Sequence, residues 1–500
     1  MLWAVVALTA AARLAWALGH EGYLGVDGGA YLLSRNAVLG AEPTGMGFPR
    51  PPLAPGWLLV PFTAWLDDDV GYKVWAVLAS LPLIPAAYLL ARRFLPPWQA
   101  LTAATLVAVD MGLAEMLVTG PLPMLGFALI AVGAWAMLGL ASAPHWRYAL
   151  ALTGVLPLIA FTNQTSAGLA AVTFTTLYMA LAVYHPSMAS QPVWRRVLAA
   201  PWTLRWTAIA AVPGLLLSMA ALPWYLAVVP GAGVLRYPGP LVYLTGWPDI
   251  VWFVLVAALV VGVLTAVRAR AVDYRLQATG VLVAVLGVLQ VFLSYDESII
   301  NIFYRATYLL PVFAAPCAVW LTARALPRTP AWRRLAVGAT LALVAVLAAG
   351  NVSQWQRQAA YSDMVTPATA RALATLDDGQ GIVTNAFSMG LWVAALRRVP
   401  SPHVWTTQPP AAYQAQDAQV RCVLGWVADC DVGQAVQALQ VGHVLVDERF
   451  PRYNQRAPGN YMAPPDQWRV TARAPWLRLT YSEGTTRLYR IESAYARSAP

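Results

Sequence analysis

The feature that most constrains this chain is a series of apolar stretches, each about 20 residues long, between residues 1 and 350. A helix of that length spans the hydrocarbon core of a membrane, because all its backbone hydrogen bonds are made within the segment. About eleven stretches qualify by this length rule. The candidate spans are 2–18, 71–91, 98–118, 120–141, 148–162, 164–184, 205–228, 249–267, 275–294, 305–323 and 334–350. The sequence therefore predicts a polytopic α-helical membrane protein.

Composition agrees with this prediction and argues against a nucleic-acid partner. Hydrophobic residues make up 59% of the chain and charged residues only 11%, whereas charged residues are about a quarter of an average soluble domain. The net charge of +10 comes largely from arginines in short loops between apolar stretches. That distribution is typical of membrane topology, so membrane lipids are the expected surroundings and nucleic acid is not a partner.

The arginines also predict the direction of each span, because loops rich in arginine stay in the cytoplasm. They occur in alternate loops: Arg92, Arg93, Arg147, Arg195, Arg196, Arg205, Arg268, Arg270, Arg275, Arg324, Arg328, Arg333 and Arg334. The opposite loops carry acids: Glu21, Asp27, Glu42, Asp67, Asp68, Asp69, Asp296 and Glu297. Residues 351–500 then lie outside the cytoplasm. We expect an integral protein of the inner membrane of a prokaryotic cell.

Two alternatives concern the spans themselves. Residues 148–184 contain Pro157 and the polar run from Thr162 to Ser166, and a single long helix there would reverse every later span. The later arginines argue against that reversal. The first span could instead be a signal peptide, but it lacks a basic start and a small-residue cleavage site. Arg13 inside it would need a partner or a water-filled cavity at membrane depth.

The first exterior loop, residues 19–70, is unusually long, and long ordered loops tend to carry function. Asp27 lies there between Val26 and a glycine pair, with Tyr31 one helical turn later. Glycine lets a backbone approach a ligand closely, although Asp27 could also be an ordinary solvated acid. The apolar run from Trp57 to Trp65 is too short to span, which predicts a helix in the outer interface.

Residues 351–500 are expected to form a soluble exterior α/β domain. Strands are predicted from Gly381 to Asn385 and from Val441 to Val446, and helices from Ala386 to Leu396 and from Val432 to Leu439. A hairpin is predicted from 476 to 491, with its turn at Glu483-Gly484. We find no nucleotide-binding glycine pattern, catalytic triad or metal-ligand spacing there, so the domain is interpreted as an accessory or lid domain.

The chain has three cysteines. Cys317 lies in an apolar span, whereas Cys422 and Cys430 lie eight residues apart in the expected exterior domain. Disulfides persist in oxidising compartments, so we predict that Cys422 and Cys430 are linked.

Several features of the transmembrane domain, residues 1–350, follow one another in an order that resembles a known family. They are a first helix with Arg13, then Asp27, Tyr31 and Gly40, the segment Arg50-Pro51-Pro52-Leu53, an interfacial helix, a second span ending in Ala91-Arg92-Arg93, and Phe303-Tyr304-Arg305 before a late span. This order resembles the polyprenyl-phosphate-dependent glycosyltransferases of the GT-C fold, such as the protein O-mannosyltransferases and the lipid A aminoarabinose transferases. The resemblance implies a C-terminal exterior α/β domain as well.

The resemblance also implies roles for individual residues. Asp27 would be the catalytic base of an inverting hexosyl or pentosyl transferase, and it would take the proton from the attacking acceptor group. Arg50 and Arg305 would bind the phosphate of the lipid-linked donor, because guanidinium pairs bidentately with phosphate oxygens. Tyr31 and Tyr304 would support the site. Arg305 could instead snorkel to lipid headgroups or pair with nearby acids.

One departure from the family pattern concerns a second acid. Many relatives carry one where the third span meets the fourth, but this chain has Val118-Thr119-Gly120-Pro121 there. Glu115 and Asp110 lie earlier and are the possible substitutes; Asp110 could instead pair with Arg13. Without the second acid a metal-assisted variant loses support, so no metal or other cofactor is predicted beyond the polyprenyl-phosphate donor.

The leading hypothesis is therefore a cell-envelope glycosyltransferase whose acceptor, a protein, a glycan or a lipid, the residues do not name. A transporter or flippase of a lipid-linked sugar would also need basic residues and a polar cavity. Transporters often contain inverted repeats, and we see none here. An inactive membrane scaffold is the third hypothesis.

Overall fold

The structure is a computed structural model of the 500-residue chain. It describes residues 1–25, 28–40, 53–110, 121–162, 164–221, 250–269, 273–293, 306–325, 329, 334–335, 338–350, 363–376, 379–385, 387–402, 410–449 and 467–492.

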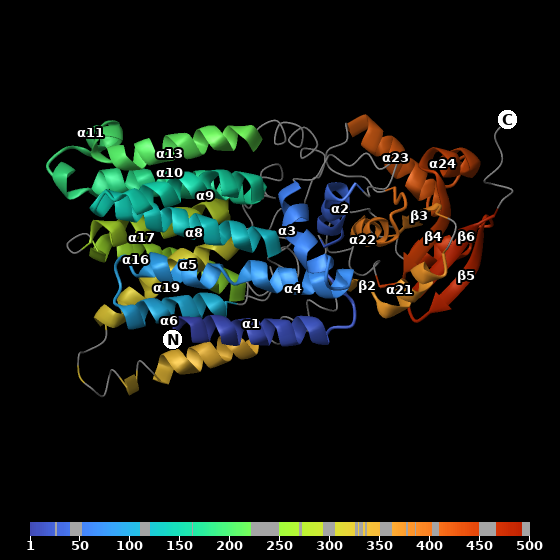
Figure 1. Cartoon of the computed structure of the whole chain (residues 1–500), viewed down its shortest axis with the longest axis horizontal. Coiled ribbons are helices and arrows are strands. Elements are labelled where there is room, and N and C mark those ends of the chain that lie inside the picture. The colour runs from blue at the N-terminus through green and yellow to red at the C-terminus, as the bar shows by residue number, and fades with distance from the viewer. Residues whose placement is uncertain are drawn as a thin grey trace.

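Long helices lie side by side along the long axis of the molecule, and a β-sheet lies at one end of this bundle (Figure 1). The bundle helices are α1 (Leu2–Gly19), α4 (Asp68–Ser80), α5 (Leu83–Ala91), α6 (Pro97–Ala108), α8 (Pro121–Ser142), α9 (Trp146–Thr162), α10 (Gln164–Tyr184), α13 (Arg205–Ser218), α16 (Ile250–Arg268), α17 (Tyr274–Leu293) and α19 (Ala306–Ala325). Short elements η1 (Pro186–Met188), α11 (Val193–Leu198), α12 (Ala200–Thr203) and η2 (Met219–Ala221) connect them, and residues 338–350 are also helical.

Within the described residues, five helical segments are long and apolar enough to cross a membrane. They are Leu2–Gly19, Asp68–Ala91, Leu122–Ser142, Ser166–Tyr184 and Tyr308–Ala325. Five shorter apolar helices accompany them. Each of the spans expected from the sequence overlaps at least one described helix, which supports a polytopic helical bundle. The number of crossings, about eleven by the length rule, remains a prediction.

Two spans differ in detail from the expectation. The predicted span 71–91 is two helices, α4 and α5, separated at Leu81-Pro82. Proline has no N–H to continue a helical ladder, so the break at Pro82 has a local cause. The polar run near residue 163 separates α9 from α10, and these two helices pack against each other. Residues 148–184 are therefore not one long helix.

Two helices of the first exterior loop, α2 (Gly28–Val38) and α3 (Leu53–Thr63), lie between the bundle and the sheet (Figure 1). Helix α3 confirms the helix expected near Trp57, and both Trp57 and Trp65 are exposed. Its location in the outer membrane interface remains a prediction.

The C-terminal part contains a four-stranded sheet of order β3-β4-β6-β5. Its strands are β3 (Gly381–Thr384), β4 (Val441–Asp447), β5 (Leu477–Glu483) and β6 (Thr486–Ile491). Strands β3 and β4 are parallel, with Val383 opposite Val444, and β6 is antiparallel to both β4 and β5. The helices are α21 (Pro367–Ala374), α22 (Phe387–Arg397), α23 (Pro410–Val423), α24 (Val432–Leu439) and α26 (Gln467–Ala472). These bounds confirm the predicted strands, helices and hairpin.

Helices cover both faces of this sheet, and alternate residues of β4 show it. Val444 and Val446 are buried in one hydrophobic cluster with Val423 and Val436, from α23 and α24. Leu445 is buried in a different cluster, which contains Trp392 of α22. Side chains alternate along a strand, so each face of the sheet has its own core.

The second of these clusters extends beyond the sheet into the bundle. It contains Leu391 and Trp392 from α22, and it continues through Tyr31 of α2 to Tyr72 and Trp75 of α4. A short antiparallel ladder supports the same contact, because β1 (Tyr23–Leu24) pairs with β2 (Asp363–Val365). The first exterior loop and the C-terminal part therefore share a single hydrophobic core.

Candidate active site

The site expected from the sequence centres on Asp27, and the structure describes its immediate surroundings. Five of the residues to which the sequence assigned a role in the reaction lie outside the described residues: Asp27, Arg50, Glu115, Tyr304 and Arg305. The other two, Tyr31 and Asp110, are described. The described residues on either side of Asp27 are Gly25 and Gly28, so the position of the loop is known at both ends.

Trp392 contacts both ends of this short loop. Its indole N–H donates a hydrogen bond of 2.8 Å to the carbonyl oxygen of Gly25. On the other side, a Cβ atom added to Gly28 would collide with the Trp392 ring, and one added to Gly29 would collide with the Trp392 main chain. Only residues without a side chain fit so close to the tryptophan. The glycines beside Asp27 therefore permit contact with α22.

Tyr31 belongs to a buried aromatic cluster beneath the loop. Its ring lies 6.4 Å from that of Tyr72 and 5.5 Å from that of Trp75. Trp392 meets Tyr72 and Tyr23 edge to face, at 5.5 Å and 5.2 Å. Edge-to-face aromatic pairs add to the stability of a core. The structure thus brings Tyr31 to the base of the loop, where it supports the packing.

Arg35 and Asn36 of α2 form a polar network at the same junction. The Arg35 guanidinium is buried and binds both carboxylate oxygens of Asp68, one at 3.0 Å, as well as the amide oxygen of Asn36 at 2.7 Å. The Asn36 side-chain amide in turn donates a hydrogen bond of 2.9 Å to the carbonyl oxygen of Ala395 in α22. The network connects α2, α4 and α22.

Lys73, the only lysine in the sequence, lies in α4, and its side chain is buried. Its ammonium donates 2.6 Å hydrogen bonds to the carbonyl oxygen of His20 and to the carboxylate of Asp69. Burial, followed by the charges of Asp69, Asp68 and Asp67, raises the pKa of the Tyr23 hydroxyl to about 12. Tyr23 is therefore a neutral hydrogen-bonding group at neutral pH.

Asp110 is the other described residue from the expected site. It follows the end of α6 and is half-buried. Arg13 of α1 is buried. Its guanidinium donates hydrogen bonds to the hydroxyl of Ser80, at 2.6 Å, and to the carbonyl oxygen of Ala108, at 3.3 Å. Arg13 thus connects α1, α4 and the end of α6 that precedes Asp110.

Arg35, Lys73 and Trp392 were not among the site residues predicted from the sequence. The sequence contains a feature that could have indicated Lys73. This residue follows Asp69 by four residues in an otherwise apolar stretch, and this spacing brings two side chains together on the surface of a helix. No feature of the sequence indicated Trp392, because its partner Gly25 is 367 residues away.

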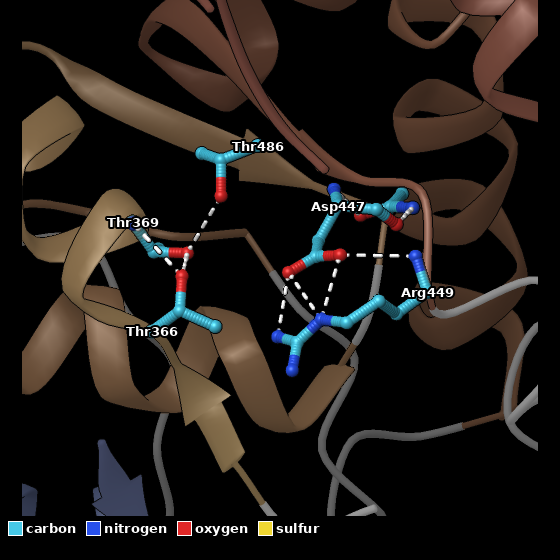
Figure 2. A network of polar contacts seen from close by, with 6 residues as sticks. Thr366, Thr369, Asp447, Arg449 and Thr486 are labelled. Atoms are coloured by element: carbon cyan, nitrogen blue, oxygen red, sulfur yellow. Dashed lines mark hydrogen bonds and ion pairs between the residues drawn. The ribbon is translucent and has the colours of Figure 1, made fainter. Parts of the chain in front are cut away.

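In α/β folds, ligands often bind at the carboxyl ends of parallel strands. The carboxyl ends of β3 and β4 are therefore a second candidate site. Here it holds an internal network (Figure 2): the buried Asp447 carboxylate binds the Arg449 guanidinium at 2.6 Å and the Arg449 main-chain N–H at 2.9 Å. Asn385 exchanges hydrogen bonds of 2.9 and 3.0 Å with the main chain of Asp447. These groups find their partners within the chain, which favours a structural role.

The remaining candidates lie elsewhere. A cavity of about 380 Å³ is lined by residues that include Leu140, His185, Trp202 and Arg205, at the end of the bundle away from the sheet. Among the described residues, no group of three or more His, Cys, Asp or Glu side chains could hold a metal ion. The thiols of Cys422 and Cys430 form a disulfide with a Cα–Cα distance of 6.0 Å.

Comparison with known proteins gives no match in sequence but several in structure. No protein-family model and no curated protein matches the chain. ArnT from Cupriavidus metallidurans in the apo state has a TM-score of 0.56 at 15% identity, over 99% of each chain, and the same protein bound to undecaprenyl phosphate has a TM-score of 0.55. The archaeal oligosaccharyltransferase AglB from Archaeoglobus fulgidus, in complex with an inhibitory peptide and a dolichol-phosphate, has a TM-score of 0.57 at 13% identity, over 100% of this chain and 75% of that one.

This chain has the GT-C fold. The GT-C fold implied by the sequence resemblance is thereby confirmed. The arabinofuranosyltransferase AftD from Mycobacteria matches as well, with a TM-score of 0.56 at 14% identity over 97% of this chain and 40% of that one. At these identities the likeness establishes the GT-C fold alone, since one fold can host different functions.

Proposed function

We propose that this chain is an integral membrane glycosyltransferase that moves a sugar from a polyprenyl-phosphate donor to an acceptor on the exterior face. The observation that carries the proposal is the GT-C fold over 99% of both this chain and ArnT, which has been solved with undecaprenyl phosphate bound. The oligosaccharyltransferase AglB, solved with a dolichol-phosphate, supports the same class of donor.

The proposed reaction is a single inverting displacement. The acceptor hydroxyl or amine forms a bond to the anomeric carbon while the bond from that carbon to the phosphate oxygen breaks, and the electron pair stays on the phosphate. The acceptor proton passes to the Asp27 carboxylate, as general base catalysis requires. The sugar then has the opposite anomeric configuration and the lipid leaves as polyprenyl phosphate.

Arg50 and Arg305 are proposed to stabilise the leaving phosphate. The donor is a phosphodiester with one negative charge, and its product is a phosphomonoester that gains a second charge as the bond breaks. The two guanidinium groups bind the phosphate more strongly as this negative charge develops. They therefore stabilise the transition state more than the ground state and lower the activation barrier for sugar transfer. No metal ion is part of the proposal.

The test is the substitution Asp27→Asn in protein reconstituted into nanodiscs. The probes are undecaprenyl-phosphate mannose and undecaprenyl-phosphate aminoarabinose with radiolabelled sugars, and a membrane extract supplies acceptors. The amide keeps the shape of the carboxylate but cannot accept the proton, so we expect sugar transfer to fall by at least about 100-fold. Binding of undecaprenyl phosphate should stay within about twofold, since the base does not contact the phosphate.

Asp67→Asn is the matched control, because Asp67 is an exposed acid of the same exterior loop that makes no side-chain capping bond to α4. It should transfer at the rate of the unmodified protein. Transfer at that rate by Asp27→Asn would remove Asp27 from the mechanism. Movement of the intact donor across the bilayer without sugar transfer would overturn the proposed function in favour of a flippase.

A further inference from the structure

Glycines lie close to Asp27 on both sides. Gly25 has a positive φ of 105°, and Gly28 and Gly29 follow Asp27 directly in the sequence. Glycine has the largest backbone freedom of any residue, so these glycines by themselves do little to fix the position of a neighbouring carboxylate. A general base must lie within about 3 Å of the proton it removes, and a misplacement of about 1 Å can lower a rate 100-fold.

The C-terminal part supplies that restraint at three points. Strand β2 pairs with β1 immediately before the loop, with Tyr23 opposite Val365. The Trp392 indole holds the Gly25 carbonyl at 2.8 Å, and the same residue packs against Gly28 and Gly29. One turn further along α22, the Ala395 carbonyl accepts from Asn36 at 2.9 Å, which anchors the far end of α2.

Trp392 is itself held rigidly. Its side chain is fully buried, with an exposed fraction of 0%, and its ring is fixed by edge-to-face contacts with Tyr23 and Tyr72. A buried aromatic ring in a close-packed core has few alternative positions. Because consecutive Cα atoms are about 3.8 Å apart, Asp27 is only one peptide bond from the Gly28 that this ring contacts.

We propose that Trp392 is a positioning residue: its indole N–H bond to Gly25 and its packing on Gly28 and Gly29 hold Asp27 where it can accept the acceptor's proton. This inference rests on the proposed function. The C-terminal part is then more than an accessory or lid domain, since it completes the active site by fixing the catalytic loop from outside the bundle. The residue acts through the loop and does not touch the substrate.

The test compares two substitutions that make the same chemical change. Trp392→Phe keeps an aromatic ring and removes the N–H donor to the Gly25 carbonyl. Trp476→Phe removes an equivalent indole bond, which Trp476 donates to the Val423 carbonyl at 2.9 Å within the C-terminal part, away from the loop. A loss of stability alone would affect both variants, whereas a loss of positioning would affect only the first.

With the radiolabelled undecaprenyl-phosphate sugars, we expect Trp392→Phe to lower kcat by about tenfold or more, with KM for the donor within about twofold. Trp476→Phe should keep both constants. Hydrogen exchange of peptides covering residues 20–36 should be faster in Trp392→Phe than in Trp476→Phe. An unchanged kcat in Trp392→Phe would overturn the positioning role. If the unmodified protein transfers no sugar, the proposed function fails, and unchanged exchange in residues 20–36 would then overturn the positioning role separately.

Discussion

At the scale of single residues, the buried cations of the exterior loop and first spans show what this fold demands. Removing a charge from water costs several kcal/mol unless partners replace the lost hydration. Arg35 meets a carboxylate and an amide, and Lys73 meets a carboxylate and a carbonyl. Arg13 donates hydrogen bonds to the Ser80 hydroxyl and to the Ala108 carbonyl oxygen. Each cation bonds its own helix to at least one other segment of the chain.

Arg305 is predicted to bind the donor phosphate, and the substitution Arg305→Ala tests this at the same scale. Loss of a charge-assisted hydrogen bond should weaken binding of undecaprenyl phosphate by about 1.5 to 3 kcal/mol, or roughly 10- to 150-fold in Kd. Arg305→Lys should restore only part of the affinity, because lysine keeps the charge and loses the planar fork. The measurement is titration of the reconstituted protein with undecaprenyl phosphate.

The control for Arg305 is Arg324→Ala, because Arg324 lies in the last turn of α19, the helix that begins at the residue after Arg305, and against the ring of Trp320. It is predicted to lie on the cytoplasmic side and should leave the affinity unchanged. Unchanged affinity in Arg305→Ala would instead identify Arg305 as an interfacial arginine that snorkels to lipid headgroups or pairs with Asp296 or Glu297. That outcome would leave the role of Asp27 intact.

At the scale of secondary-structure elements, two helices of the C-terminal part are connected by the disulfide. Cys422 lies at the end of α23, and Cys430 precedes Asp431, whose carboxylate caps α24 by accepting from the Gln434 main-chain N–H at 2.9 Å. The bond restricts the unfolded chain by closing a short loop. It also requires an oxidising compartment, which agrees with the predicted exterior location.

We predict that the double substitution Cys422→Ser, Cys430→Ser lowers the free energy of unfolding of the C-terminal part by about 2 to 3 kcal/mol. The measurement is urea denaturation of the reconstituted protein, followed by tryptophan fluorescence. Cys317→Ala provides the background for thiol labelling, since Cys317 is a buried free thiol of α19. Labelling of both Cys422 and Cys430 in unreduced protein would contradict the disulfide and weaken the exterior assignment.

At the scale of the whole molecule, charge is separated along the long axis. Helix α11, which contains Arg195 and Arg196, lies at the end of the bundle opposite the sheet (Figure 1). The acids Asp67, Asp68 and Asp69 lie at the other end, where α4 meets β1. Because arginine-rich loops remain in the cytoplasm, this separation favours an exterior location for the sheet.

That topology predicts opposite accessibility for two introduced cysteines. Ser482→Cys, at an exposed position of β5, should react with a membrane-impermeant maleimide in intact spheroplasts. Ser190→Cys, at an exposed position between η1 and α11, should react only after the membrane is permeabilised. The unmodified protein gives the background, because its cysteines are either buried or disulfide-bonded. The reverse pattern would place the sheet in the cytoplasm.

Features that depend on neighbours along the chain could be predicted from the amino-acid sequence. Apolar stretches long enough to span a membrane predicted the helices of the bundle, and short runs rich in β-branched apolar residues predicted strands such as β4, because both signals lie within the element itself. The break at Pro82 was missed even though its cause is local, since a proline within an apolar stretch can either bend a helix or end it.

The contact between the C-terminal part and the loop of residues 19–70 could not be predicted and became evident from the three-dimensional packing. The resemblance singled out Asp27 by its place in an order of motifs, but nothing near it in sequence indicated Trp392 or the pairing of β1 with β2. Gly28 and Gly29 look like ordinary loop glycines until the tryptophan that packs on them is known. Gly25 and Trp392 are 367 residues apart, and no repeating pattern in the sequence indicates that they are in contact. Such a contact arises from the packing of two surfaces, and each residue of these surfaces need only be apolar or small.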